Sequence, residues 1–151
     1  TNVCDIFGKD DDFDFCKAKV MQEGDDVTVI TNGETLAEVI QAAKILEKDG
    51  YSIQIIHVPV VKPLDDATII ENAKKTKFVI TVENHSIIGG LGSAVCELLS
   101  YYYPMPVIRI GVNDTFGQSG TWQELLDYYG LNADKLSKTI KKQIDRYRLV
   151  K

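Results

Sequence analysis

A polar tripeptide that could take part in acid–base chemistry, Glu83-Asn84-His85, directly follows the β-branched run from Phe78 to Val82. The next residues are glycine-rich, with Gly-Gly-Leu-Gly over residues 89–92, and apolar residues at helical spacing come after them. This order predicts a buried strand, a turn that carries polar groups, and a helix whose first N–H groups are free. In open α/β sheets, ligands bind in the crevice where such a turn lies.

Direct catalysis requires more than this tripeptide. A general acid or base acts on a partner group, and the rest of the sequence shows no partner base, activated nucleophile or set of metal ligands. A contact or structural role is therefore favoured over catalysis, and no residue is assigned as catalytic. A second glycine-rich loop begins at Asp114 and supplies a further contact surface. The residues that could form a ligand or interface patch are Glu83, Asn84, His85, Gly89, Gly90, Gly92 and Asp114.

The glycine-rich turn also invites comparison with a dinucleotide-binding fingerprint, in which glycines let the backbone approach a pyrophosphate. The match is poor, because Val95 stands where the third glycine is required, and no acidic residue ends a strand about 20 residues further on. Close packing of the helix against the strand, or a weak anion site at Gly89 to Gly92, is favoured over dinucleotide binding.

Metal and disulfide chemistry are not expected. The three cysteines, Cys4, Cys16 and Cys96, are odd in number and lack Cys-x-x-Cys spacing, which is typical of a reducing cytoplasm. His57 lies inside an apolar strand and is expected to be a core histidine. With unpatterned cysteines and only two histidines, a transition-metal site is not predicted.

Composition sets the class of protein. The chain has 151 residues with 44% hydrophobic and 26% charged residues, which suits one globular domain. Its net charge of -5 disfavours nucleic-acid binding, and the basic stretch over residues 135–148 is interpreted as the solvated side of a helix. No apolar run is long enough to span a membrane.

Strands and helices alternate along the chain. Residues 1–14, which include five aspartates, are expected to form an acidic linker or tail, with Phe7, Phe13 and Phe15 as possible anchors. Residues 15–21 and 27–31 are predicted to form a hairpin at a sheet edge. Further strands are predicted over residues 53–58, 78–82 and 107–110.

Helices are predicted between these strands and after them. Capping-box spacing at Thr35 and Glu38, and again at Thr121 and Glu124, predicts two helix starts. These two helices are expected to end at Gly50 and Gly130. The other helices are expected to run from a cap at Asp65 or Asp66 to about Thr76, from about Gly90 to Tyr102, and onward from a cap at Asn132. The fold class is therefore α/β, with three layers: a mostly parallel, five-stranded twisted sheet with one antiparallel edge strand and helices on both faces.

Four segments in order, GDDVTVITNG, VVKPLD, VENHSIIGGLGSAV and IRIGVNDTFGQSG, resemble the C-terminal domain of the transketolase family of thiamine diphosphate enzymes. The resemblance covers residues 15–151. It implies an assembly and dimer-supporting domain that binds no cofactor itself. In the complete enzyme, thiamine diphosphate and a divalent metal would lie between two other domains. One of these domains would hold the diphosphate through a metal-binding Gly-Asp-Gly motif, which this sequence lacks.

The resemblance also implies the function of the whole enzyme, which is ketol transfer between sugar phosphates in the pentose phosphate pathway of the cytoplasm, by a homodimer. Alone, this chain is expected to be inactive. The segments are closer to the transketolase members than to 1-deoxy-D-xylulose 5-phosphate synthase, which stays an alternative, and the β subunits of 2-oxo acid dehydrogenases rank third. A stand-alone anion-binding module and a nicotinamide-linked enzyme are the remaining hypotheses.

Overall fold

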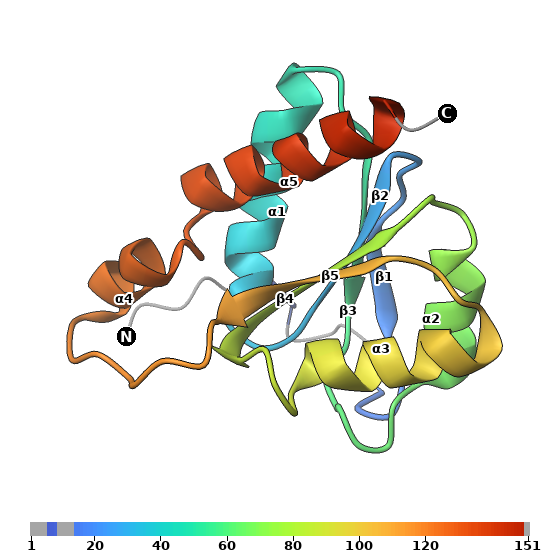
Figure 1. Ribbon diagram of the computed structural model, residues 1–151, viewed down its shortest axis with the longest axis horizontal. Coiled ribbons are helices and arrows are strands. Elements are labelled where there is room, and N and C mark those ends of the chain that lie inside the picture. The colour runs from blue at the N-terminus through green and yellow to red at the C-terminus, as the bar shows by residue number, and fades with distance from the viewer. Residues whose placement is uncertain (1–5, 9–13, 150–151) are drawn as a thin grey trace.

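The computed structural model describes residues 6–8 and 14–149. Within these residues, five strands form one sheet in the order β1-β3-β2-β4-β5 (Figure 1). The strands are β1 (Lys19–Gln22), β2 (Val27–Thr31), β3 (Ile53–His57), β4 (Val79–Ser86) and β5 (Val107–Val112). The helices are α1 (Thr35–Lys48), α2 (Asp66–Ala73), α3 (Leu91–Tyr102), α4 (Trp122–Tyr129) and α5 (Ala133–Leu149).

The predicted α/β class with one antiparallel edge strand is confirmed, but the predicted hairpin is wrong. Strand β1 pairs antiparallel with β3, not with β2, and the other neighbouring strands are parallel. The connection from β1 to β2 therefore crosses the start of β3. At the crossing, a Cβ atom on Gly24 would lie 2.3 Å from the carbonyl carbon of Ile53, so only glycine allows this path.

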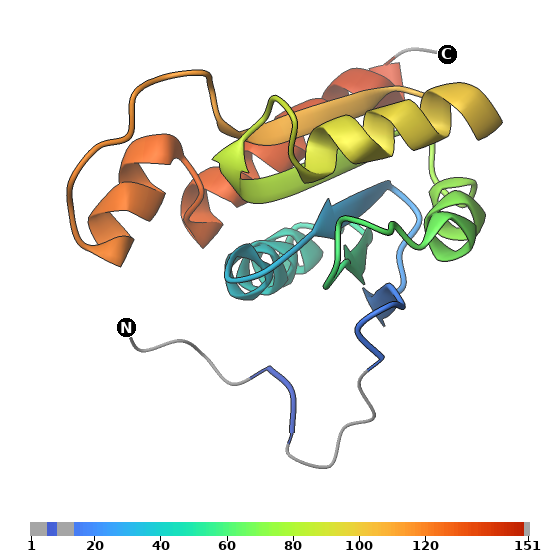
Figure 2. The same cartoon turned by 90° about the horizontal axis from the view of Figure 1, so that it is seen from below.

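Helices cover both faces of the sheet. Helices α1 and α5 lie on one face, and α2 and α3 lie on the other (Figures 1 and 2). Every residue of β2 and β3 is buried, as expected for parallel strands that are covered on both sides. Alternate residues face opposite layers: Val29 packs in the core beneath α1 and α5, and Ile30 in the core beneath α2 and α3. Among the described helices, none combines the length and apolarity required to cross a membrane.

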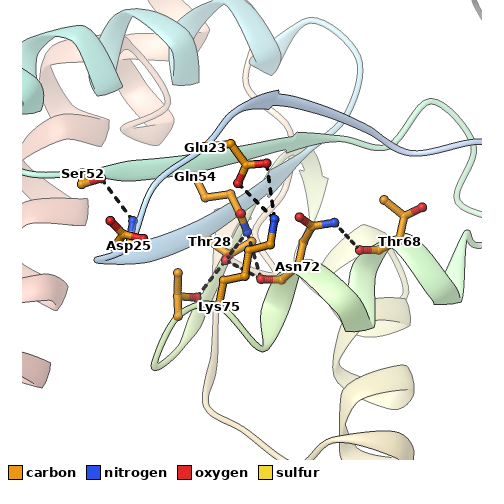
Figure 3. A network of polar contacts seen from close by, with 9 residues as sticks. Glu23, Asp25, Thr28, Ser52, Gln54, Thr68, Asn72 and Lys75 are labelled. Carbon is orange, nitrogen blue, oxygen red and sulfur yellow. Dashed lines mark hydrogen bonds and ion pairs between the residues drawn. The ribbon is translucent and has the colours of Figure 1, made fainter.

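A buried polar cluster joins α2 to the sheet (Figure 3). The side-chain amide of Gln54 donates to the hydroxyl of Thr28 (2.8 Å) and to the main-chain carbonyl of Asn72 (3.0 Å). The hydroxyls of Thr28 and Thr76 are 2.8 Å apart and share a hydrogen bond. Because hydrogen bonds are directional, this cluster sets the position of α2 along β2 and β3 more strictly than apolar contact alone would.

The helix ends mostly follow the predictions. Thr121 and Glu124 form the predicted capping box, and Gly50 and Gly130 adopt the left-handed conformation, with φ values of 80° and 73°. The predicted capping box at Thr35 is wrong. Thr35 is already the first residue of α1, and the carboxylate of Glu38 accepts from the N–H of Ala133 (2.7 Å) at the start of α5.

Helix α5 is attached to the rest of the fold by aromatic and ionic contacts. The ring of Tyr147 stacks on Phe78, with ring centroids 4.2 Å apart. The guanidinium of Arg148 donates hydrogen bonds to the carboxylate of Asp26, with 2.7 Å between Nη2 and Oδ1. Lys135, Lys138, Lys142 and Arg146 are exposed, as predicted for a solvated side of the helix, whereas Lys141 is half-buried and donates to the hydroxyl of Tyr51.

Much of the predicted linker lies outside the described residues, including Phe13 and all of residues 1–5. Phe7 is half-buried and packs against the core, with its ring centroid 5.5 Å from that of His57. Phe15 is 67% exposed. The prediction of a core position for His57 is confirmed, and burial together with nearby Lys19 lowers its pKa.

Candidate functional site

The predicted patch lies at the carboxyl ends of β4 and β5. Strand β4 continues to Ser86, so the predicted turn at residues 83–85 is wrong, and these residues are part of the strand. Glu83 is 1% exposed, whereas Asn84 and His85 are exposed. The pairing of β4 with β5 changes register between Val82 and Ser86, and this irregularity separates the buried carboxylate from its two exposed neighbours.

The carboxylate of Glu83 occupies the start of α3. One oxygen accepts from the N–H of Leu91 (2.8 Å), and the other accepts from the N–H of Gly92 (2.9 Å). A negative charge at this position also interacts favourably with the helix dipole. The chain thus fills with its own carboxylate the place where an anion would bind in a helix-start site.

The glycines of the turn make room for this carboxylate and for close packing. A Cβ atom on Gly90 would lie 2.0 Å from an oxygen of Glu83, and a Cβ atom on Gly92 would lie 2.7 Å from the hydroxyl of Thr81. Gly89 has a φ of 79°, a conformation that favours glycine. Close packing of helix and strand therefore accounts for the motif that resembles a dinucleotide fingerprint.

Replacing Gly90 by alanine should lower the free energy of unfolding by about 1–3 kcal/mol, because the new methyl group must displace the buried carboxylate of Glu83. Urea denaturation of the two proteins measures the difference. Gly117→Ala is the matched control, since a Cβ atom at Gly117 would meet no atom within 4 Å. Equal effects of the two substitutions would show that the carboxylate does not require this glycine.

Arg109 is a site residue that the sequence analysis missed. Its guanidinium donates to the carbonyl of Ile87 (2.8 Å), and its aliphatic part lies beside Gly92. The hydroxyl of Ser93 also donates to the carbonyl of Ile87 (3.3 Å) and accepts from the N–H of Gly89 (2.8 Å). The only signal in the sequence was a single charged residue within the apolar strand over residues 107–112.

The second loop of the patch begins after β5. Asp114 is exposed and has a φ of 31°, which is uncommon for a residue other than glycine. Phe116 in the same loop is 94% exposed. This loop and the exposed residues Asn84 and His85 follow or end neighbouring strands at one edge of the sheet, so they form a surface and not an enclosed site.

The strand order also defines a crevice between the carboxyl ends of β2 and β4, because β2 lies between β3 and β4. Two threonine side chains occupy this crevice. The hydroxyl of Thr31 donates to the carbonyl of Val82 (2.9 Å), and the hydroxyl of Thr35 donates to the carbonyl of Asn32 (2.7 Å). Thr31 and Thr35 are fully buried, so the crevice is closed by hydrogen bonds within the chain.

A cleft of about 520 Å³ lies beside α3. Lys62 lines it together with two carboxylates, Asp66 and Glu97, so its charges do not favour an anionic ligand. Among residues 6–8 and 14–149, no group of three His, Cys, Asp or Glu side chains could hold a metal ion. Neither this cleft nor the start of α3 has the groups that a diphosphate and its metal would require, so these sites do not fit thiamine diphosphate.

Two groups in this region have shifted pKa values. Burial would raise the pKa of Asp65, but hydrogen bonds from Thr68 and from the N–H of Ala18, with nearby Lys17, outweigh it and lower the pKa. Burial raises the pKa of the Cys96 thiol, although nearby Arg109 opposes the shift. Asp65 is thus held as the negatively charged cap of α2, and Cys96 is kept as a thiol.

Comparison with known proteins identifies the class. Residues 16–136 match the family described as "Transketolase, C-terminal domain", and the chain belongs to this family. The order of the strands, the glycine-rich start of α3 and the loop after β5 all fall within the matched range. The resemblance noted from the sequence is therefore confirmed.

Individual relatives are consistent with this membership. The chain is 43% identical over 136 residues to the "Putative transketolase C-terminal section" of Methanocaldococcus jannaschii. This alignment covers 89% of the chain and 42% of that protein. It is 36% identical over 137 residues to the 1-deoxy-D-xylulose-5-phosphate synthase of Caldanaerobacter subterraneus, in an alignment that covers 90% of this chain and 22% of that enzyme. A solved structure described as "Split gene transketolase, inactive beta4 tetramer" superposes with a TM-score of 0.87 at 42% identity, over 95% of this chain and 47% of that one. The chain therefore spans less than half the length of these relatives.

Proposed function

We propose that this chain is the C-terminal assembly domain of a split transketolase subunit and that it is not catalytic alone. The observation that carries the proposal is the carboxylate of Glu83 at the start of α3. In a member of this family, the strand end best placed for a ligand is filled by the chain itself. The cofactor and its metal would then be held by other parts of the enzyme. The relatives are more than twice as long as the part that this chain matches, which is consistent with such parts.

The exposed part of the patch would make contact with those other parts. Asn84, His85 and Asp114 are exposed, and Gly89 lies in the turn that precedes α3. In this proposal, residues 15–151 form the domain, and residues 1–14 form an acidic linker to the remainder of the enzyme. The complete enzyme would be a homodimer that transfers ketol units between sugar phosphates in the cytoplasmic pentose phosphate pathway.

Ligand titration tests the first part of the proposal. Thiamine diphosphate with Mg²⁺, and inorganic phosphate separately, should produce no heat of binding to the isolated chain by calorimetry. The amide signals of Gly90, Gly92 and Ser93 should not move in NMR spectra, because Glu83 already accepts from the N–H groups of Leu91 and Gly92 at the start of α3. Saturable shifts at these amides with phosphate would favour the stand-alone anion-binding module instead.

A chimera tests the assembly role. We would replace the matching C-terminal part of the Methanocaldococcus jannaschii relative with this chain and measure its mass by light scattering and its ketol transfer in the presence of its cognate subunit. The chimera should keep the assembly state and ketol transfer of the unmodified relative. A chimera that folds but neither assembles nor restores ketol transfer would contradict the proposal.

The synthase relative at 36% identity supports a second candidate, the C-terminal domain of a 1-deoxy-D-xylulose 5-phosphate synthase. The same exchange in the Caldanaerobacter enzyme distinguishes the two. If the chain restores synthase activity but not ketol transfer, the second candidate is favoured.

A further inference from the structure

The short described segment before β1 contacts the sheet through an aromatic side chain. Ile6 and Phe7 are half-buried and pack against the core beneath α1 and α5. The ring of Phe7 lies beside the ring of His57, with 5.5 Å between the ring centroids and 43° between the ring planes. Residues 6–8, which we call the strap, thus contact the last residue of β3.

His57 occupies a position where a positive charge is unfavourable. Its side chain is 6% exposed, and it lies directly opposite Lys19 in the antiparallel pairing of β1 with β3. Burial, together with nearby Lys19, lowers the pKa of the imidazole below 6.5, so the ring is neutral at neutral pH. A proton on this ring would place two positive charges opposite each other in a cross-strand pair, which is a destabilising arrangement.

The neighbours of His57 do not compensate for such a charge. An imidazolium group can be attracted to the face of an aromatic ring, but the ammonium group of Lys19 already lies over Phe7, 5.2 Å from the ring centroid. On the other side of β3, His57 is opposite Thr31 of β2, which carries no charge. Protonation would therefore add a second cation to a cluster that already holds one.

Asp65 attaches the start of β1 by contacts that do not change when His57 titrates. Its carboxylate accepts from the N–H of Ala18 (3.0 Å), caps α2 at Thr68, and lies 3.9 Å from the ammonium group of Lys17. Although burial would raise the pKa of this carboxyl, hydrogen bonds from Thr68 and Ala18 lower it below 3.8. Asp65 and Lys17 therefore keep opposite charges above about pH 5, and β1 stays in place.

We propose that the strap is a pH-sensitive switch, which docks on His57 while that ring is neutral and is released when the ring takes up a proton. The docked strap has its full stability above pH 6.5 and loses stability as the pH falls from 6.5 through the lowered pKa of His57. Histidine is the side chain that ordinarily titrates in this range. The switch depends on Phe7, His57 and Lys19 and not on the proposed function, so either can fail without the other.

NMR spectra of the 151-residue chain test the proposal between about pH 7.5 and about pH 5. Nuclear Overhauser contacts between the ring of Phe7 and the side chain of Lys19 should weaken at least about threefold as the imidazole signals of His57 titrate. His57→Gln, which stays neutral, should keep these contacts at both pH values. His85→Gln is the matched control at an exposed histidine and should behave like the wild type.

A second measurement does not require a change at His57. If docking of the strap and protonation of His57 oppose each other, removing the docked ring must favour protonation. Phe7→Ala should therefore move the pKa of His57 upward, toward 6.5. A wild-type strap that stays docked at about pH 5 would overturn the proposal, as would release at low pH in folded His57→Gln or an unchanged His57 pKa in Phe7→Ala.

Discussion

Replacing Glu83 by alanine should lower the free energy of unfolding by about 3–5 kcal/mol. The side chain is 1% exposed, and its two oxygens accept from the N–H groups of Leu91 and Gly92. Without the carboxylate, these buried donors lose their partner, and the helix dipole loses a favourable charge. Urea denaturation followed by circular dichroism measures the loss.

Two further variants separate this effect from a general loss of volume. Glu83→Gln keeps the size of the side chain but supplies one acceptor oxygen in place of two, so its effect should lie between those of the wild type and Glu83→Ala. Glu97→Ala, at an exposed position of the same helix, should change stability by no more than about 0.5 kcal/mol. If Glu83→Ala were as stable as Glu97→Ala, the carboxylate would not be what holds the start of α3.

Replacing Phe78 by alanine should cost about 3–5 kcal/mol. The ring is 1% exposed and stacks on Tyr147, with an angle of 15° between the ring planes. Its loss would leave a cavity between the sheet and α5 and remove the aromatic contact. Thermal and urea denaturation measure the change in stability, and hydrogen exchange should show α5 opening more often than in the wild type.

Phe116→Ala is the matched control for this substitution. It removes the same side chain from a position that is 94% exposed, so stability should change by less than about 0.5 kcal/mol. If Phe78→Ala lost stability without increasing exchange in α5, the stack on Tyr147 would not be what attaches this helix to the sheet.

Local sequence patterns were enough to place most of the elements. The β-branched runs over residues 27–31, 53–57 and 79–82 became buried strands, because such side chains pack well on a pleated, covered surface. Gly130 ended α4 in a left-handed conformation, and Thr121 and Glu124 formed the capping box. Each of these features depends on residues close together in the chain.

The predictions that proved wrong concern residues that bond or pair with a partner distant in the chain instead of the nearby partner that the local pattern indicated. Thr35 and Glu38 have the spacing of a capping box, but Glu38 instead caps the start of α5 through Ala133. The residues before β2 have the pattern of a hairpin strand, but β1 pairs with β3 because the chain crosses near Gly24. A local pattern indicates which bonds are possible, and the packed fold determines which of them form.

The stretch over residues 78–92 shows both sides of this division. The sequence by itself determined a strand, a glycine-rich turn and a helix start, as well as the family, since these depend on residue types at short spacing. Only the tertiary structure decided that Glu83 points inward to the amides of α3 while Asn84 and His85 remain exposed. The choice depends on the irregular pairing of β4 with β5 and on the space left by Gly90, which brings together groups that no short-range pattern relates.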